Sequence, residues 1–237
     1  MRSDMTYLAD NLAAVRDEIR TAEERAGRAG KTTLIAAVKY TDAAHIAELV
    51  RLGVCDLGEN RVQQLTEHAR ELDEMGVDGV RFHFIGTLQK NKVKYLADRV
   101  VMIHSVDSLP LAEEIERQMA KRGKKMDVLV EINSGNEESK SGVAPSDAAA
   151  LCAEIARLPH LNLRGFMTMA PKCEKNEDYH KYFRETYKIG LDIWTKTLHN
   201  IGSPIFSMGM SASFPVAIEE GADFVRVGRR LVAPSEE

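Results

Sequence analysis

The sequence predicts a single α/β barrel of the (β/α)8 type with an extra helix at its N-terminus. Eight short apolar runs alternate with helix-like segments. The runs are continuously apolar, as in parallel strands that are covered on both faces. The length of 237 residues suits such a barrel. A doubly wound open sheet is the competing architecture, and counting strands does not exclude it.

The first predicted element is an amphipathic helix over residues 4–28. Its apolar positions recur at steps of three and four, the spacing of one helix face. They are Leu8, Leu12, Val15, Ile19 and Ala22. After Gly27 and Gly30 the pattern changes to short β-rich runs.

The predicted strands and helices then alternate along the chain. The strands are Thr33–Tyr40, Val54–Gly58, Arg81–Gly86, Val100–Val106, Asp127–Asn133, Leu163–Met169, Ile205–Met208 and Phe224–Gly228. The helices are Ala43–Arg51, Arg61–Met75, Lys90–Asp98, Leu109–Arg122, Ser146–Leu158, Asp178–His199 and Phe214–Gly221. Asp, Ser or Asn residues stand where several of them are expected to begin, as helix N-caps often do. Because no linker rich in Pro, Gly or Ser interrupts the alternation, we expect one domain over residues 1–237.

Composition excludes several classes of protein. The 32 basic and 36 acidic residues are well mixed, so nucleic acid is not the expected partner. No apolar run approaches the roughly 20 residues of a membrane span, and Met1–Met5 does not resemble a secretory signal. We therefore expect a cytoplasmic protein. Cys55, Cys152 and Cys173 are far apart, and neither they nor the histidines show a metal-binding spacing.

Lys39 is the only charged side chain in the run from Leu34 to Tyr40. A lysine at the carboxyl end of a buried strand is poorly hydrated, which disfavours its ammonium form and makes the amine a nucleophile toward carbonyl groups. Lys39 is therefore a candidate Schiff-base lysine. The alternative is a lysine that ends the strand and reaches into water.

In a barrel, the residues that follow each strand share one mouth. Asn60, Met167, Ser211 and Gly228 stand at such strand ends and leave room for a planar ligand. Structural roles remain open for them. Asn60 and Ser211 are also suited to cap the next helices, and methionine is common in cores.

The last two strand ends predict a phosphate site. The loops after strands seven and eight of a barrel commonly hold a phosphate near a helix N-terminus. Here they are Ser207–Ser211 and Arg226–Gly228, whose glycines allow close approach of the backbone, although tight turns also use glycine. A lysine at strand one and a phosphate cup at strands seven and eight match the layout of a pyridoxal phosphate site.

The sequence resembles the pyridoxal phosphate homeostasis proteins, whose fold is like the N-terminal barrel of alanine racemase. The resemblance runs from about Leu8 to Val232. Its segments are Ala37–Lys39, Leu57–Gln63, His83–Lys92, Ser139–Gly142, Leu163–Met169, Ser207–Ser211 and Val225–Gly228.

The resemblance implies that Lys39 forms a Schiff base with pyridoxal 5'-phosphate. It places Ser211, Arg226 and Gly228 around the phosphate and the ring, and Asn60 and Met167 beside the ring. Whether Arg226 contacts the phosphate or the ring nitrogen stays open.

Several positions depart from the family's usual pattern. Tyr40 and Thr41 stand where threonine and lysine are common, and Ala212 stands next to Ser211 where an aspartate is usual. Arg229 replaces a frequent small hydroxyl residue. An inward-pointing Arg229 would supply the phosphate contact that this hydroxyl would otherwise make.

The resemblance implies a protein that holds pyridoxal phosphate and delivers it, for which apo forms of pyridoxal phosphate enzymes are candidate partners. Alanine racemase takes its second base from a C-terminal domain, which we do not expect here because the chain ends soon after the eighth strand. For the same reason we expect a monomer without robust catalysis. The alternatives are a racemase or related enzyme with Tyr40 as second base, and a barrel that has lost the cofactor and acts as an interaction module.

Overall fold

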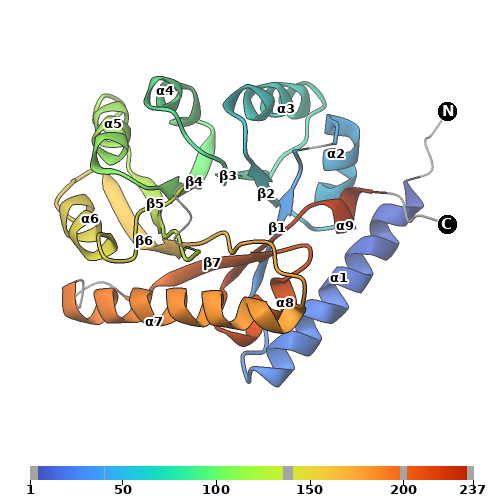
Figure 1. The fold of residues 1–237 in the computed structure, drawn as a ribbon. Helices are drawn as coiled ribbons and strands as arrows, with labels where there is room; N and C mark the ends of the chain where they lie inside the picture. The colour runs from blue at the N-terminus through green and yellow to red at the C-terminus, as the bar shows by residue number, and fades with distance from the viewer. Residues whose placement is uncertain (1–4, 40, 136–140, 198–201, 234–237) are drawn as a thin grey trace.

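The computed structural model describes residues 5–39, 41–135, 141–197 and 202–233 and shows a closed barrel of eight parallel strands (Figure 1). The predicted positions 4, 40, 139, 140, 198 and 199 lie outside these ranges. The strands are β1 (Thr33–Ala37), β2 (Asp56–Glu59), β3 (Arg81–Phe84), β4 (Val100–Val106), β5 (Met126–Glu131), β6 (Leu161–Met167), β7 (Ile205–Met210) and β8 (Phe224–Val227). β1 pairs with β8 from Thr33 opposite Phe224 to Ala36 opposite Val227, so the sheet closes. The predicted barrel is confirmed, and the open sheet is excluded.

Helices surround the strands (Figure 1). They are α1 (Thr6–Arg25), α2 (Ala43–Arg51), α3 (Val62–Glu74), η1 (Lys90–Lys92), α4 (Val93–Leu96), α5 (Leu109–Ala120), α6 (Ala148–Ile155), η2 (Asn176–Asp178), α7 (Tyr179–Thr197), α8 (Phe214–Glu219) and α9 (Arg229–Val232). The predicted helix over Lys90–Asp98 is shorter and begins as a 3-10 turn. The short helices η2 and α9 were not predicted. None of the helices in the described ranges is long and apolar enough to span a membrane.

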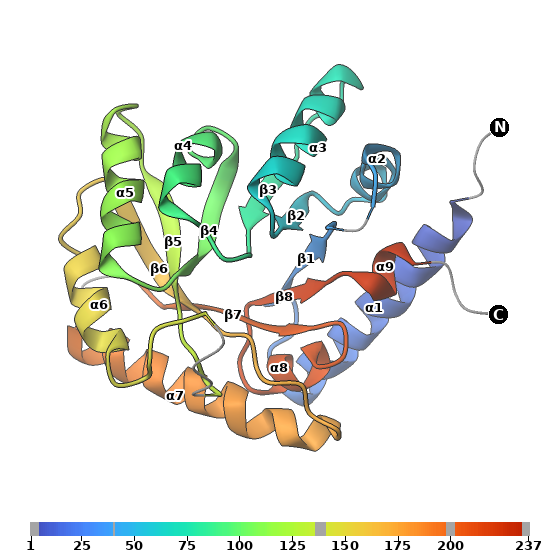
Figure 2. The same ribbon diagram turned by 45° about the horizontal axis from the view of Figure 1, so that its top comes forward.

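The extra helix α1 buries its predicted apolar face, which includes Leu8 and Leu12. It lies beside α8 and α9 (Figure 2). The Asn11 side-chain amide donates hydrogen bonds to the carbonyl oxygens of Leu231 at 3.1 Å and Ala233 at 2.9 Å. These bonds hold α9, the segment that directly follows β8.

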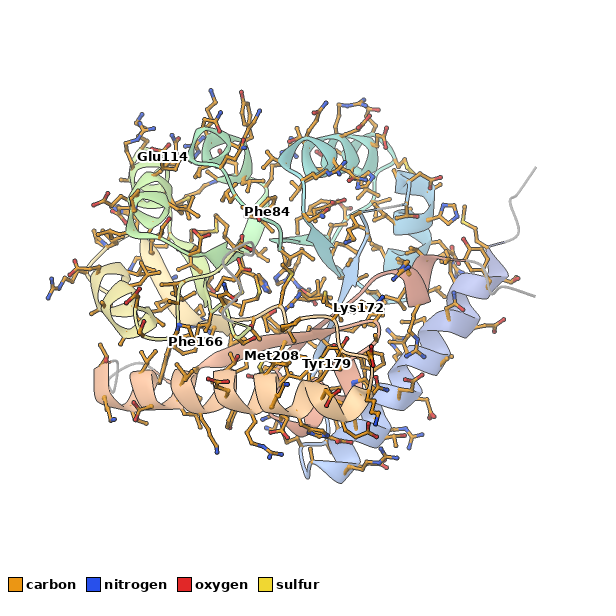
Figure 3. All side chains as sticks on the ribbon, in the orientation of Figure 1. Phe84, Glu114, Phe166, Lys172, Tyr179 and Met208 are labelled. Atoms are coloured by element: carbon orange, nitrogen blue, oxygen red, sulfur yellow. The ribbon has the colours of Figure 1, made fainter. Side chains whose placement is uncertain are left out.

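The helix α7 packs closely on the outside of the barrel. Phe166, labelled above α7 in Figure 3, stacks on Phe206 and contacts the edge of Trp194 in α7. A Cβ atom at Gly190 would lie only 2.5 Å from the Phe206 ring. The absence of a side chain at Gly190 therefore lets the helix approach β6 and β7.

Candidate functional site

Lys39 lies in the turn after β1 and is half-buried. The predicted strand extended to Tyr40, but β1 ends at Ala37, so Lys39 stands two residues beyond it. The Gln64 side-chain amide of α3 donates a hydrogen bond of 2.8 Å to the Lys39 carbonyl oxygen. The backbone that presents Lys39 is therefore anchored to a neighbouring helix.

A buried ion pair supports the same turn. The His68 ring contacts the carboxylate of fully buried Glu59 at 2.7 Å and hydrogen-bonds the backbone of Thr41. Burial lowers the pKa of His68, but Glu59 outweighs burial and raises this pKa above its ordinary value. The contact between His68 and Glu59 thus joins the end of β2 to the turn that contains Lys39.

Asn60 follows β2 and presents a buried, unsatisfied oxygen. Its side-chain Oδ1 has no hydrogen-bond partner among the described residues. The N-cap of α3 is Arg61, so the Asn60 side chain is not the cap. A Cβ atom at Gly86 would lie 2.2 Å from the Asn60 carbonyl oxygen, so only glycine fits there. A buried acceptor without a partner at a barrel mouth is suited to receive a hydrogen bond from a ligand.

The two loops predicted to form the phosphate cup are joined. The Gly228 N–H donates a 3.2 Å hydrogen bond to the Ser211 hydroxyl oxygen. A Cβ atom at Gly228 would lie 3.1 Å from the Ala37 carbonyl oxygen at the end of β1. Barrel closure therefore brings the loop after β7 and the end of β8 next to the turn with Lys39. Arg229 is exposed as the first residue of α9.

Arg226 is buried and points across β7 toward the end of β6. Its guanidinium donates hydrogen bonds to the Ser207 hydroxyl at 2.6 Å and to the Thr168 carbonyl oxygen at 2.8 Å. Burial lowers the pKa of Arg226 to about 10, although Glu131 opposes this shift. Burial also raises the pKa of Glu131, while Ser141 and Arg226 act in the opposite direction. The site thus contains a buried cation that stays charged at neutral pH.

Met167 is the last residue of β6 and is fully buried. It packs with Met102 and Leu129 in a small apolar cluster that is separate from the main core. Its predicted role beside a ligand ring stays a prediction.

The sequence predictions missed the polar residues inside the barrel. His83, His104 and Ser207 are buried and hydrogen-bonded to one another. The available signal was the pair of histidines inside apolar strand runs, because a buried polar side chain needs a partner. Within the described ranges, no group of three or more His, Cys, Asp and Glu residues could hold a metal ion.

Comparison with known proteins shows the family. The model of the alanine racemase N-terminal domain matches residues 11–235. The chain is therefore a barrel protein of the alanine racemase N-terminal domain class. It is 40% identical over 223 residues to the pyridoxal phosphate homeostasis protein of Aquifex aeolicus, covering 94% of this chain and 96% of that protein. Identity to the Escherichia coli K12 protein of the same name is 35%, with 96% of each chain covered. The chain belongs to the pyridoxal phosphate homeostasis protein family.

Solved structures agree with this fold. PipY of Synechococcus elongatus, determined with PLP bound, superposes with a TM-score of 0.83 at 28% identity, covering 94% of this chain and 99% of PipY. Alanine racemase of Clostridium difficile gives a TM-score of 0.74 at 20% identity. That match covers 98% of this chain and 58% of the racemase. At this identity the racemase shows the fold alone.

Proposed function

We propose that this protein binds pyridoxal 5'-phosphate through a Schiff base on Lys39 and acts in intracellular cofactor homeostasis without robust catalysis. The observation that carries this proposal is the closure of β1 on β8. It brings the Lys39 turn beside the contact between Ser211 and Gly228. The names of the relatives and the PLP bound to PipY support the same cofactor.

The residues present fit a phosphorylated aromatic aldehyde. Bound pyridoxal phosphate would supply an aldehyde carbon, which is an electrophile for a lysine amine. Lys39 would provide that amine. Ser211 and Gly228 would hold the phosphate, and the unpartnered Asn60 oxygen would accept a hydrogen bond from a ring substituent. Arg226 would supply a buried positive charge, held by Ser207 and the Thr168 carbonyl oxygen.

We infer a carrier rather than a racemase, because the relatives are named pyridoxal phosphate homeostasis proteins. Two-base racemisation needs a second acid–base group on the opposite face of the substrate. Tyr40, the candidate for that role, lies outside the described residues. Turnover of free amino acids that is lost in Tyr40→Phe would contradict the carrier proposal, whereas no turnover across a range of amino acids would support it.

The proposal also covers where the protein acts and which proteins receive the cofactor. We place the protein in the cytoplasm as a monomeric single domain over residues 1–237, with apo forms of pyridoxal phosphate enzymes as recipients. Transfer of bound cofactor to an apoenzyme faster than free exchange would support direct delivery. Transfer limited by the dissociation rate of the cofactor would mean release into solution.

An absorbance titration with pyridoxal phosphate tests the binding proposal. The wild-type protein should develop a saturable new band, and Lys39→Ala should not. Lys92→Ala is the matched control, because Lys92 is an exposed lysine of η1. Equal bands in Lys39→Ala and the wild type would show that the cofactor reacts elsewhere.

A further inference from the structure

A continuous chain of hydrogen-bonded polar side chains leads away from Arg226 through the barrel. Arg226 donates to the Ser207 hydroxyl at 2.6 Å, and this hydroxyl contacts His104 Nδ1 at 2.9 Å. His104 Nε2 lies 2.9 Å from His83 Nδ1. His83 Nε2 lies 3.0 Å from the Asp56 carboxylate. The function proposed above uses only the first member of this chain.

The chain spans the barrel from one end to the other. Ser207 is on β7 and His104 is on β4, and these strands are not neighbours, so their hydrogen bond crosses the interior. Asp56 is the first residue of β2 and pairs with Arg81, the first residue of β3. The chain therefore ends at the rim opposite the mouth where Lys39 stands.

The inner members of the chain are shielded from water. His104 and Ser207 are 0% exposed, and His83 is 4% exposed. The Phe224 ring packs against both imidazoles at centroid distances of 5.8 Å. Because water does not reach these groups, their donors and acceptors need partners among the hydrogen-bonded side chains themselves.

The charges at the two ends are opposite. Burial opposes ionisation of Asp56, but hydrogen bonds from His83 and Arg81 outweigh it and lower the pKa of Asp56 to about 2. Burial lowers the pKa of His104 well below its ordinary value, with His83 and Arg226 acting in the same direction. His104 is therefore neutral, between a carboxylate at one end and the Arg226 guanidinium at the other.

With His83 neutral, these charges determine the direction of each hydrogen bond. The Asp56 carboxylate can only accept, so His83 Nε2 donates to it. In a neutral His83, Nδ1 then accepts from His104 Nε2–H, which leaves His104 Nδ1 as an acceptor. Ser207 donates its hydroxyl proton to His104 and accepts from Arg226.

If the hydrogen bonds ran in the opposite direction, the Ser207 hydroxyl would be left as an unsatisfied donor. An extra proton on His83 would make its Nδ1 a donor and force His104 to donate to Ser207. Ser207 would then receive bonds from both His104 and Arg226, and its own hydroxyl hydrogen would have no acceptor in the chain. An unsatisfied buried donor costs roughly 1–3 kcal/mol. The direction from Arg226 to Asp56 is therefore favoured.

We propose that His83 and His104 are positioning residues for Arg226, joined in a one-directional hydrogen-bond chain that begins at Asp56 on the opposite rim. This hydrogen-bond chain keeps the Ser207 oxygen available as an acceptor for Arg226. It thereby orients the Arg226 guanidinium within the cofactor site. The effect on the cofactor rests on the proposed function. The direction of the chain is a property of the protein alone.

The first test reads the histidine tautomers in the cofactor-free protein by ¹⁵N NMR of the ring nitrogens. We expect both His83 and His104 to carry their proton on Nε2. His104 protonated on Nδ1 would overturn the proposal. The signals are assigned with the single variants His83→Gln and His104→Gln. His160→Gln is the control, since His160 pairs with Glu116 outside the chain.

The second test compares the affinity of variants for pyridoxal phosphate. Ser207→Ala removes the acceptor of Arg226 and should weaken binding about three- to tenfold, the effect of one hydrogen bond of ordinary strength. Ser207→Thr keeps the hydroxyl and should restore most of the affinity. Asp56→Asn replaces an obligate acceptor with an amide that can also donate. Asp56→Asn should also weaken the binding of pyridoxal phosphate. It serves as the second variant if Ser207→Ala does not fold.

The failures of the two proposals are distinguishable. A wild-type protein that takes up no pyridoxal phosphate overturns the proposed function and the effect on the cofactor, while the tautomers still decide the direction of the chain. Normal binding in Ser207→Ala and Asp56→Asn, like an Nδ1 proton on His104, overturns the positioning role.

Discussion

The individual residues of the site divide into those that a ligand would contact and those that hold them in place. Lys39, Asn60, Ser211 and Gly228 surround the mouth of the barrel, and their positions at strand ends made them predictable from the sequence. Gln64 and His68 anchor the Lys39 turn from α3. Their role could not be predicted, because it depends on how a helix face packs against a loop.

Asn60 allows a test that separates binding from stability. Asn60→Ala removes a buried oxygen that has no partner among the described residues. We expect pyridoxal phosphate to bind about tenfold more weakly, with little change in thermal stability, because no hydrogen bond of that oxygen is lost on substitution. Titration and thermal unfolding measure the two quantities. Asn91→Ala, at an exposed asparagine of η1, is the control. Unchanged affinity would show that Asn60 does not contact the ligand.

Asp56 should contribute to stability in a pH-dependent way. Its pKa is about 2 in the folded protein against an ordinary value of 3.8, so the carboxylate stabilises the fold above about pH 4. This contribution is lost as the pH falls through about 2. Asp56→Asn should therefore be less stable at neutral pH, and its deficit should shrink in acid. Urea unfolding across this pH range measures the deficit beside the exposed control Asp78→Asn. A deficit independent of pH would argue against an ionic role.

The order of the strands and helices was easier to predict than the residues at which they begin and end. Continuous apolar runs and helical periodicity located each strand and the crossover helices. The pattern could not show that β1 stops at Ala37, because Val38 is also apolar and buried. Nor could it show η1 or the one-turn helices, since hydrogen bonding and not periodicity defines such short segments.

The helix α1 should act on the site through α9. Asn11→Ala removes two hydrogen bonds to the carbonyl oxygens of Leu231 and Ala233. We expect a loss of about 1–2 kcal/mol in the free energy of unfolding. Chemical denaturation measures this loss, with Asp10→Ala on the exposed face of α1 as the control. Equal stability of the two variants would mean that α9 is held by packing alone.

The close packing of α7 on the barrel allows a second prediction about the elements. In Gly190→Ala the new methyl group would lie 2.5 Å from Phe206 and 2.7 Å from Phe166. Alanine favours a helix by about 1 kcal/mol over glycine, but overpacking costs about 1–3 kcal/mol. We expect net destabilisation in thermal unfolding. Gly202→Ala, where the new Cβ has no atom within 4 Å, is the matched control. A more stable Gly190→Ala would show that α7 is free to shift outward.

At the scale of the whole molecule, closure of the barrel brings the first and the last strand side by side. Lys39 follows the first strand and Gly228 follows the last, and only closure makes β1 and β8 neighbours. This juxtaposition could be predicted once the barrel was inferred. The polar interior could not, because the bond between His104 and Ser207 joins strands that are distant both in sequence and around the barrel.

The central claim is that Lys39 is the residue that binds the cofactor covalently. Borohydride reduction of the protein with pyridoxal phosphate, followed by peptide mass mapping, tests this claim most directly. We expect one stoichiometric pyridoxyl adduct on Lys39 in the wild-type protein and none in Lys39→Ala. An adduct distributed over exposed lysines such as Lys92, or no adduct at all, would contradict the proposed site.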